Sequence, residues 1–182
     1  MQIRAGFEII YQCPQQTPMV FLLTVHPSRL PDLVNEHRIT FDPAIEPHDY
    51  RDGFGNICTR IVAPAGRLMV SGDFTINDSG APDIIDLDAQ QLAVQDLPDD
   101  TIVYLLGSRY CDTEHLATQA WAMFGNGPTG WGRVQAICDY VHDRLSFGYQ
   151  HASATRTAWD GFRERRGVCR DFAHLAITLC RA

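Results

Sequence analysis

The segment around Cys169 has the residue types that a cysteine nucleophile needs. Cys169 follows the turn Gly167-Val168 and opens a stretch with the apolar spacing of a helix. At the start of a helix, unpaired backbone N–H groups and the positive end of the helix dipole stabilise a thiolate. The same N–H groups can donate to the oxyanion that forms when a thiolate attacks a carbonyl carbon. The pattern favours covalent catalysis, and the alternative is a buried structural cysteine.

Such a nucleophile needs a base, and the neighbouring residues do not supply one. His174 follows Cys169 by five residues, which places it about 140° further around a helix of 3.6 residues per turn. Its imidazole is therefore not expected to reach the sulfur atom. His115, His142 and His151 lie elsewhere in the second half of the chain, and spacing alone neither selects nor excludes them.

An acid stands in the first turn of the same predicted helix. We interpret Asp171 as a residue that complements the helix dipole, and we expect it to pair with Arg170 or Arg166. His174 and Cys180 are interpreted as packing residues and not as catalysts.

The first half of the chain has the pattern of short strands separated by turns. Residues 7–11 and 18–25 are rich in β-branched and aromatic residues. Residues 52–56, Asp-Gly-Phe-Gly-Asn, tolerate positive φ and predict a tight turn or a bulged hairpin. Further strands are predicted at 57–62 and 67–76, so this half is expected to form a β-sandwich-like domain.

An acidic stretch with little apolar periodicity, residues 86–100, predicts a surface linker. We place the boundary near Leu97, which gives an N-terminal β domain at 1–97 and a helical part at 98–182. Together the two parts predict an α+β fold.

Four helices are predicted after this boundary. The first spans 113–124, with Asp112 or Thr113 as its N-cap, and a shorter one lies around 157–165. Between them, one helix places five residues on one face: Val134, Ile137, Cys138, Val141 and Leu145. The last, from 168 to 182, has an apolar face of Phe172, Leu175, Ala176 and Leu179. No capping signal follows it, and we expect that the natural chain continues.

The cysteine segment resembles a known family. The run Gly167-Val168-Cys169-Arg170-Asp171-Phe172-Ala173-His174-Leu175 is similar to the nucleophile motif of the bacterial transglutaminase-like family, whose members share the papain-like cysteine-protease fold. The upstream residues Phe147-Gly148-Tyr149 and Ser153-Ala154 match the same pattern. Residues 52–56 resemble a turn in the β domain that often precedes this core. The resemblance implies that the chain comprises this β domain and the helical first half of the transglutaminase-like core.

The resemblance implies a Cys-His-Asp catalytic triad. Of these three residues only the cysteine has a counterpart in this chain, Cys169, and the histidine and the aspartate are expected in strands further downstream. An oxyanion donor besides the Cys169 backbone N–H is expected, and Tyr149 is the candidate. The implied reaction is attack on a peptide or glutamine-type amide through a thioester, with protease or amidase activity favoured over transamidation. Residues 1–182 alone are expected to have little or no turnover.

Two other functions stay open. The transglutaminase-like core can serve as a non-catalytic scaffold or protein-interaction module whose site has degenerated. Alternatively, a papain-fold acyltransferase would load Cys169 from a coenzyme thioester.

Composition limits the partners. The formal net charge of −7 argues against non-specific binding to nucleic acid. The six cysteines form no C-x-x-C pair, and no acidic loop has calcium-binding spacing, so no metal or organic cofactor is expected. No leader and no run of about 20 apolar residues is present, which predicts a cytoplasmic protein without a membrane partner. The expected partner is a peptide or protein substrate.

Overall fold

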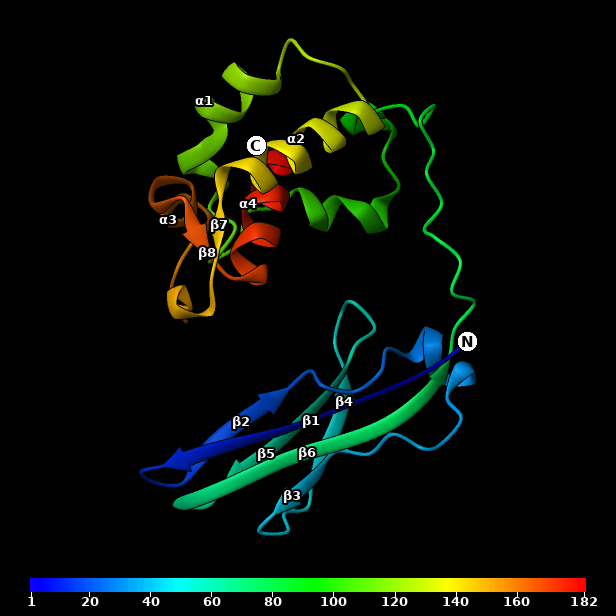
Figure 1. Cartoon of the computed structure of the whole chain (residues 1–182), viewed down its shortest axis with the longest axis vertical. Helices are drawn as coiled ribbons and strands as arrows, with labels where there is room; N and C mark the ends of the chain where they lie inside the picture. The colour runs from blue at the N-terminus through cyan, green and yellow to red at the C-terminus, as the bar shows by residue number, and fades with distance from the viewer. The chain divides into compact units, whose positions relative to one another are not determined.

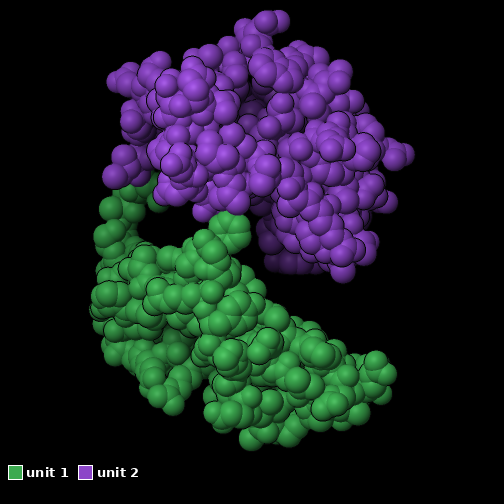
Figure 2. All heavy atoms as spheres, turned by 180° about the vertical axis from the view of Figure 1, so that it is seen from behind, with its two compact units in different colours: residues 1–83 green, residues 84–182 purple.

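The computed structural model describes all 182 residues, and they form two compact units. Unit 1 spans Met1–Asp83 and unit 2 spans Ile84–Ala182 (Figure 2). Unit 1 is built from strands, and unit 2 is mainly helical (Figure 1). The predicted α+β class is confirmed.

Unit 1 contains two three-stranded sheets, and every pairing in them is antiparallel. The strands of the first sheet, in spatial order, are β1 (Gln2–Cys13), β6 (Gly66–Asn77) and β3 (Thr40–Asp42). Those of the second are β2 (Thr17–Phe21), β5 (Ile57–Ala63) and β4 (His48–Arg51). A 3-10 helix, η1 (Pro27–Asp32), follows β2.

Both sheets contribute to one apolar core in unit 1. Its buried residues are Cys13, Phe21, Ile61, Ala63, Leu68 and Val70. Along β5 and β6 the buried positions alternate with accessible ones, because successive side chains of a strand point to opposite faces. Two sheets that share one core are what a sandwich-like domain requires.

The turn at residues 52–56 joins β4 to β5 and is held by its own side chains. Asp52 Oδ1 accepts hydrogen bonds from the backbone N–H groups of Phe54 at 2.8 Å and Asn56 at 2.9 Å. Asp52 Oδ2 accepts from Asn56 Nδ2 at 2.9 Å, and this bond contributes most to lowering the pKa of Asp52. Gly55 has a φ of 84°, a conformation that glycine adopts readily. The turn is therefore structural, as the sequence indicated.

Unit 2 begins with irregular chain and two 3-10 helices, η2 (Val94–Asp96) and η3 (Asp99–Leu105). Four α-helices follow, namely α1 (Thr113–Phe124), α2 (Trp131–Arg144), α3 (Ala158–Glu164) and α4 (Cys169–Arg181). The short elements between them are β7 (Ser146–Phe147), η4 (Tyr149–His151) and β8 (Arg166–Gly167).

Helix α4 is the central element of unit 2, because it contacts α1, α2 and α3 (Figure 1). The buried core residues are Leu116, Ala120, Ile137, Val141, Leu145, Ala158, Leu175 and Leu179. Every α-helix contributes to this set. Burial of α4 among the other three fixes the element on which Cys169 lies.

The predicted inner face of α2 is only partly buried. Ile137 and Val141 belong to the core, but Val134 is 49% exposed and Cys138 is also exposed. Val134 borders an apolar cavity of about 590 Å³ that the N-terminal half of α2 shares with α1 and the end of α4. Helical spacing correctly placed the residues on one side of α2, but it does not show how much of that side is covered.

Residues 84–97 group with unit 2, although the sequence boundary was placed at Leu97. The backbone N–H of Trp131 donates to the carbonyl of Ala89 at 3.2 Å. Arg133 Nη1 donates to Gln91 Oε1 at 3.1 Å. These contacts attach the acidic segment to the start of α2, so the compact units divide at residues 83 and 84.

Candidate functional site

Two short parallel strands bring distant parts of unit 2 together at the start of α4. β7 pairs with β8 in the register Ser146↔Arg166 and Phe147↔Gly167. The pairing continues one residue further, where Gly148 N–H donates to the Gly167 carbonyl at 3.0 Å. The segment that leads to Tyr149 therefore lies beside the segment that leads to Cys169.

Cys169 is the first residue of α4, and it is exposed. Within this chain Cys169 is therefore not a residue of the apolar core. The Cys169 backbone N–H has no acceptor within the chain, as is usual for the first N–H groups of a helix. A sulfur atom and an unpaired N–H donor on the same residue are what a thiolate attack on a carbonyl requires.

Asp171 holds the first turn of α4 in place. The residue is 2% exposed, and its Oδ2 accepts a hydrogen bond from Val168 N–H at 2.8 Å. The same oxygen accepts from Arg156 Nη1 at 3.3 Å. The predicted pairing of Asp171 with Arg170 or Arg166 was wrong.

Arg166 and Arg170, which do not pair with Asp171, have other partners. Arg166 Nε lies 3.7 Å from Glu164 Oε2, and Arg170 Nη2 donates to the Ser153 carbonyl. Arg165, which precedes β8, has a φ of 56° in the left-handed region. This conformation ends α3 and redirects the chain into β8 before Arg166.

Gly167 is explained by its contact with Asp171. A Cβ atom added at position 167 would lie 2.5 Å from Asp171 Oδ2 and 2.6 Å from Asp171 Cβ. Both separations are far below a van der Waals contact. The φ of Gly167 lies outside the left-handed region, so the backbone conformation does not demand glycine. The glycine and the acid that flank Cys169 in the motif therefore form one packing unit.

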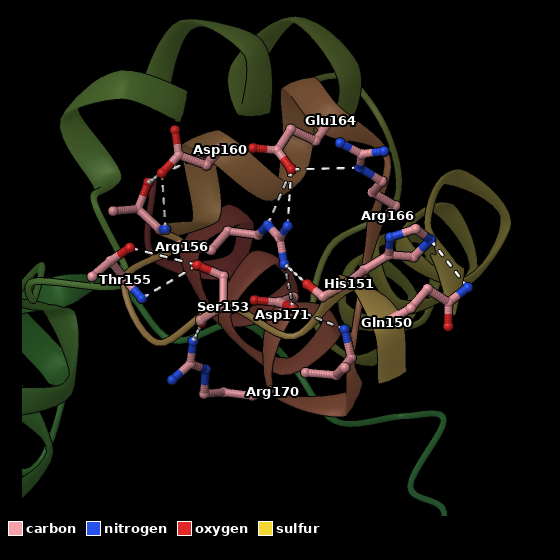
Figure 3. A network of polar contacts seen from close by, with 12 residues as sticks. Gln150, His151, Ser153, Thr155, Arg156, Asp160, Glu164, Arg166, Arg170 and Asp171 are labelled. Carbon is pink, nitrogen blue, oxygen red and sulfur yellow. Dashed lines mark hydrogen bonds and ion pairs between the residues drawn. The ribbon is translucent and has the colours of Figure 1, made fainter. Parts of the chain in front are cut away.

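Arg156 is the basic partner of Asp171, and no local signal in the sequence singles it out. Its side chain is 8% exposed. Figure 3 shows its guanidinium between Glu164, Asp171 and the backbone of His151. Glu164 Oε2 accepts from Arg156 Nη2 at 2.9 Å and from Nε at 3.3 Å. Burial opposes the charge, but hydrogen bonding and attraction to Glu164, followed by Asp171, raise the pKa of Arg156 above its ordinary value.

Tyr149 follows the short strand that pairs with the segment before Cys169. It begins η4 directly after the β7–β8 pair, and its side chain is 76% exposed. Its ring meets the edge of Phe147 at a centroid distance of 5.2 Å. The phenol can donate to a group outside the chain, and its role as an oxyanion donor stays a prediction.

No histidine of unit 2 hydrogen-bonds to the Cys169 thiol. His115 stacks against Trp159, and His142 lies 3.3 Å from Asp143 on the surface. His151 Nε2 lies 3.4 Å from Gln150 Nε2. Within unit 2, the Cys169 thiol therefore has no histidine partner.

His174 is a packing residue, as its spacing from Cys169 indicated. The imidazole stacks on Tyr110 with a centroid distance of 5.4 Å and an interplanar angle of 8°. Burial, together with the nearby charge of Arg170, lowers the pKa of His174 and favours the neutral imidazole.

Neither a metal centre nor a membrane span is present in the structure. No group of three or more His, Cys, Asp or Glu side chains is arranged to hold a metal ion. None of the helices combines the length and the apolar character needed to cross a bilayer.

Comparisons with known proteins agree with the fold. The model of the Transglutaminase-like superfamily matches residues 108–182, a range that contains all four α-helices. The crystal structure of a "Putative Cysteine Protease" from Cytophaga hutchinsonii is similar to the whole chain, with a TM-score of 0.81 and 25% sequence identity. The chain covers 65% of that protein's chain. No curated protein matches. The predicted resemblance to transglutaminase-like proteins is confirmed.

Proposed function

We propose that this chain carries the nucleophilic half of a cysteine enzyme that attacks peptide or glutamine-type amides. The observation that supports the proposal is the exposed Cys169 at the start of α4, with its unpaired backbone N–H. The Asp171–Arg156 contact that fixes this turn adds to it. The similarity to the Transglutaminase-like superfamily and to a protein described as a "Putative Cysteine Protease" supports this reaction class.

In the proposed reaction, the Cys169 sulfur forms a bond to the amide carbonyl carbon. The oxyanion of the tetrahedral intermediate accepts from the Cys169 N–H, and Tyr149 is proposed as a second donor. The carbon–nitrogen bond then breaks, the amine leaves with a proton, and a thioester remains. Water attacks the thioester, which yields a carboxylic acid and regenerates the thiol. We favour hydrolysis over transamidation because no feature of the site is suited to binding a second amine.

A base and its orienting acid are still needed, and we propose that residues following Ala182 in the natural protein supply them. Two facts support this arrangement. No histidine of unit 2 hydrogen-bonds to Cys169, and the similar crystal structure has a longer chain of which this one covers 65%. Residues 1–182 alone should then hold the Cys169 thiol in position but turn over substrate poorly. The proposed setting is the cytoplasm, with a peptide or protein substrate.

Trapping of the thioester tests this proposal. The full-length natural protein would be incubated with a glutaminyl peptide, quenched in acid, and examined by mass spectrometry. We expect an acyl adduct at Cys169 that disappears in Cys169→Ala. Cys138→Ala should keep the adduct, because Cys138 is an exposed thiol in the middle of α2 and not at a helix start.

The products separate the remaining alternatives. With a primary alkylamine present, an amide of that amine would indicate transfer, and a free acid would indicate hydrolysis. An acetyl adduct from acetyl-coenzyme A, without an adduct from the peptide, would favour the acyltransferase. Absence of any adduct in the full-length protein would contradict the proposal and favour the scaffold function, which the lack of a histidine partner for Cys169 also fits.

A further inference from the structure

Arg156 connects three segments that meet at the candidate site. It lies in the loop between η4 and α3, and its guanidinium is almost fully buried. Buried charges are rare unless they are paired, and the partners of a buried arginine therefore indicate what it fixes. Each of its three partners lies on a different element, as Figure 3 shows.

The first partner is the carbonyl of His151, which accepts from Arg156 Nη1. His151 is the last residue of η4, the short helix that begins with Tyr149. The second partner is Glu164, the last residue of α3, which accepts from Nη2 and Nε. Through these contacts, the Arg156 guanidinium joins the end of η4 to the end of α3.

The third partner is Asp171, and through it Arg156 reaches the start of α4. Asp171 Oδ2 accepts from both Arg156 Nη1 and Val168 N–H. Val168 immediately precedes Cys169, so the carboxylate fixes the backbone from which the nucleophile extends. The Asp171 carboxylate is also a negative charge two residues from Cys169, and the guanidinium compensates it. Without that compensation the carboxylate would disfavour a second negative charge on the Cys169 sulfur.

We propose that Arg156 is a positioning residue for the Cys169 nucleophile. Through Asp171 it fixes the first turn of α4, and through the His151 carbonyl it fixes the turn that carries Tyr149. The inference rests on the proposed function, because it assigns a role within that site. Arg156 does not itself touch the substrate.

A matched control exists in Arg144. This half-buried arginine also joins two helices, since its Nε and Nη2 donate to the Phe162 carbonyl at 3.2 Å and 3.0 Å. Its guanidinium carbon lies 4.0 Å from the Phe162 ring centroid. It contacts neither Asp171 nor the start of α4. Loss of Arg144 should therefore weaken the packing of unit 2 without changing the reactivity of Cys169.

The test is the rate of alkylation of Cys169 by iodoacetamide as a function of pH, mapped by mass spectrometry. Residues 1–182 would be compared with Arg156→Ala, Arg156→Lys and Arg144→Ala, with circular dichroism to establish that each is folded. In Arg156→Ala we expect the pH of half-maximal rate to rise by about one unit, as loss of a compensating charge predicts. Arg156→Lys should restore part of this shift, and Arg144→Ala should lower the melting temperature without shifting the profile.

Two results would overturn the proposal: an unchanged profile in folded Arg156→Ala, or an equal shift in Arg144→Ala. If Arg156→Ala does not fold, Arg156→Lys decides. A lysine keeps the charge but cannot donate to three partners in fixed geometry, so an unchanged profile in that variant would also overturn it. The readout needs no substrate. Failure of the proposed function appears separately, as the absence of a thioester in the full-length protein.

Discussion

Replacement of Asp171 by alanine should lower the free energy of unfolding of unit 2 by about 3–5 kcal/mol. The mutation removes one carboxylate of the buried ion pair and leaves Arg156, which is 8% exposed, with Glu164 as its only acid. It also leaves Val168 N–H without its acceptor. A buried charge that loses one of its two acidic partners is destabilised because water cannot replace the missing interaction.

Urea unfolding followed by tryptophan fluorescence measures this change in the right part of the molecule. All three tryptophans, Trp121, Trp131 and Trp159, belong to unit 2. Asp143→Ala is the matched control, because Asp143 pairs with His142 at 3.3 Å but both side chains are more than 80% exposed. An exposed pair of this kind contributes about 0–1 kcal/mol. Equal effects of Asp171→Ala and Asp143→Ala would show that the buried pair does not stabilise unit 2.

The second large effect is expected at Gly167. Gly167→Ala should destabilise unit 2 by about 1–3 kcal/mol, because its methyl group would occupy the space of the Asp171 carboxylate. Gly161→Ala is the control: an added Cβ in α3 would meet only Arg156 Cδ, at 4.0 Å. Alanine favours a helix over glycine by about 1 kcal/mol, so Gly161→Ala should leave unit 2 unchanged or stabilise it.

A double substitution tests whether Gly167 and Asp171 act as one unit. In an Asp171→Ala background the carboxylate is absent, and Gly167→Ala should then be much less destabilising than in the parent. The two free-energy changes should consequently add to more than the change in the double variant. Strict additivity would contradict the explanation given for the glycine.

Local signals in the sequence were sufficient to predict the helices on either side of the Cys169 segment and the start of α4. The expected helix at 113–124 coincides with α1, and the glycine turn before Cys169 marks the start of α4 to within one residue. Both boundaries depend on capping and on apolar spacing, which neighbouring residues determine. The exposure of Cys169 agrees with its place at the first helical position.

The partner of Asp171 could not be selected in this way. Arg156, Arg166 and Arg170 all lie close to Asp171 in sequence, and the pairing depends on how three segments fold together. The left-handed Arg165 redirects the chain before Arg166, whereas the loop after η4 directs Arg156 inward. A lone arginine among the small residues 152–158 was the only available signal, and by itself it does not distinguish a buried residue from an exposed one.

Two strands of unit 1 were not delimited for a related reason. The predicted hairpin at 52–56 implies a strand before it, but β4 has four exposed residues and lacks the alternation that would give its bounds. β3 has only three residues and is defined by its pairing with β6. The acidic segment 84–97 likewise gave no local indication that it would attach to α2. These features depend on contacts between residues far apart in sequence.

The most direct test of the central claim compares the reactivity of Cys169 with that of Cys138. Alkylation rates of both thiols would be measured against pH in residues 1–182 and in the full-length natural protein, with the sites mapped by mass spectrometry. We expect Cys169 of the full-length protein to react rapidly well below about pH 8, the range in which an ordinary thiol is protonated. Cys138, exposed within α2, should show an ordinary profile in both proteins. If Cys169 and Cys138 behave alike in both, Cys169 is not an activated nucleophile.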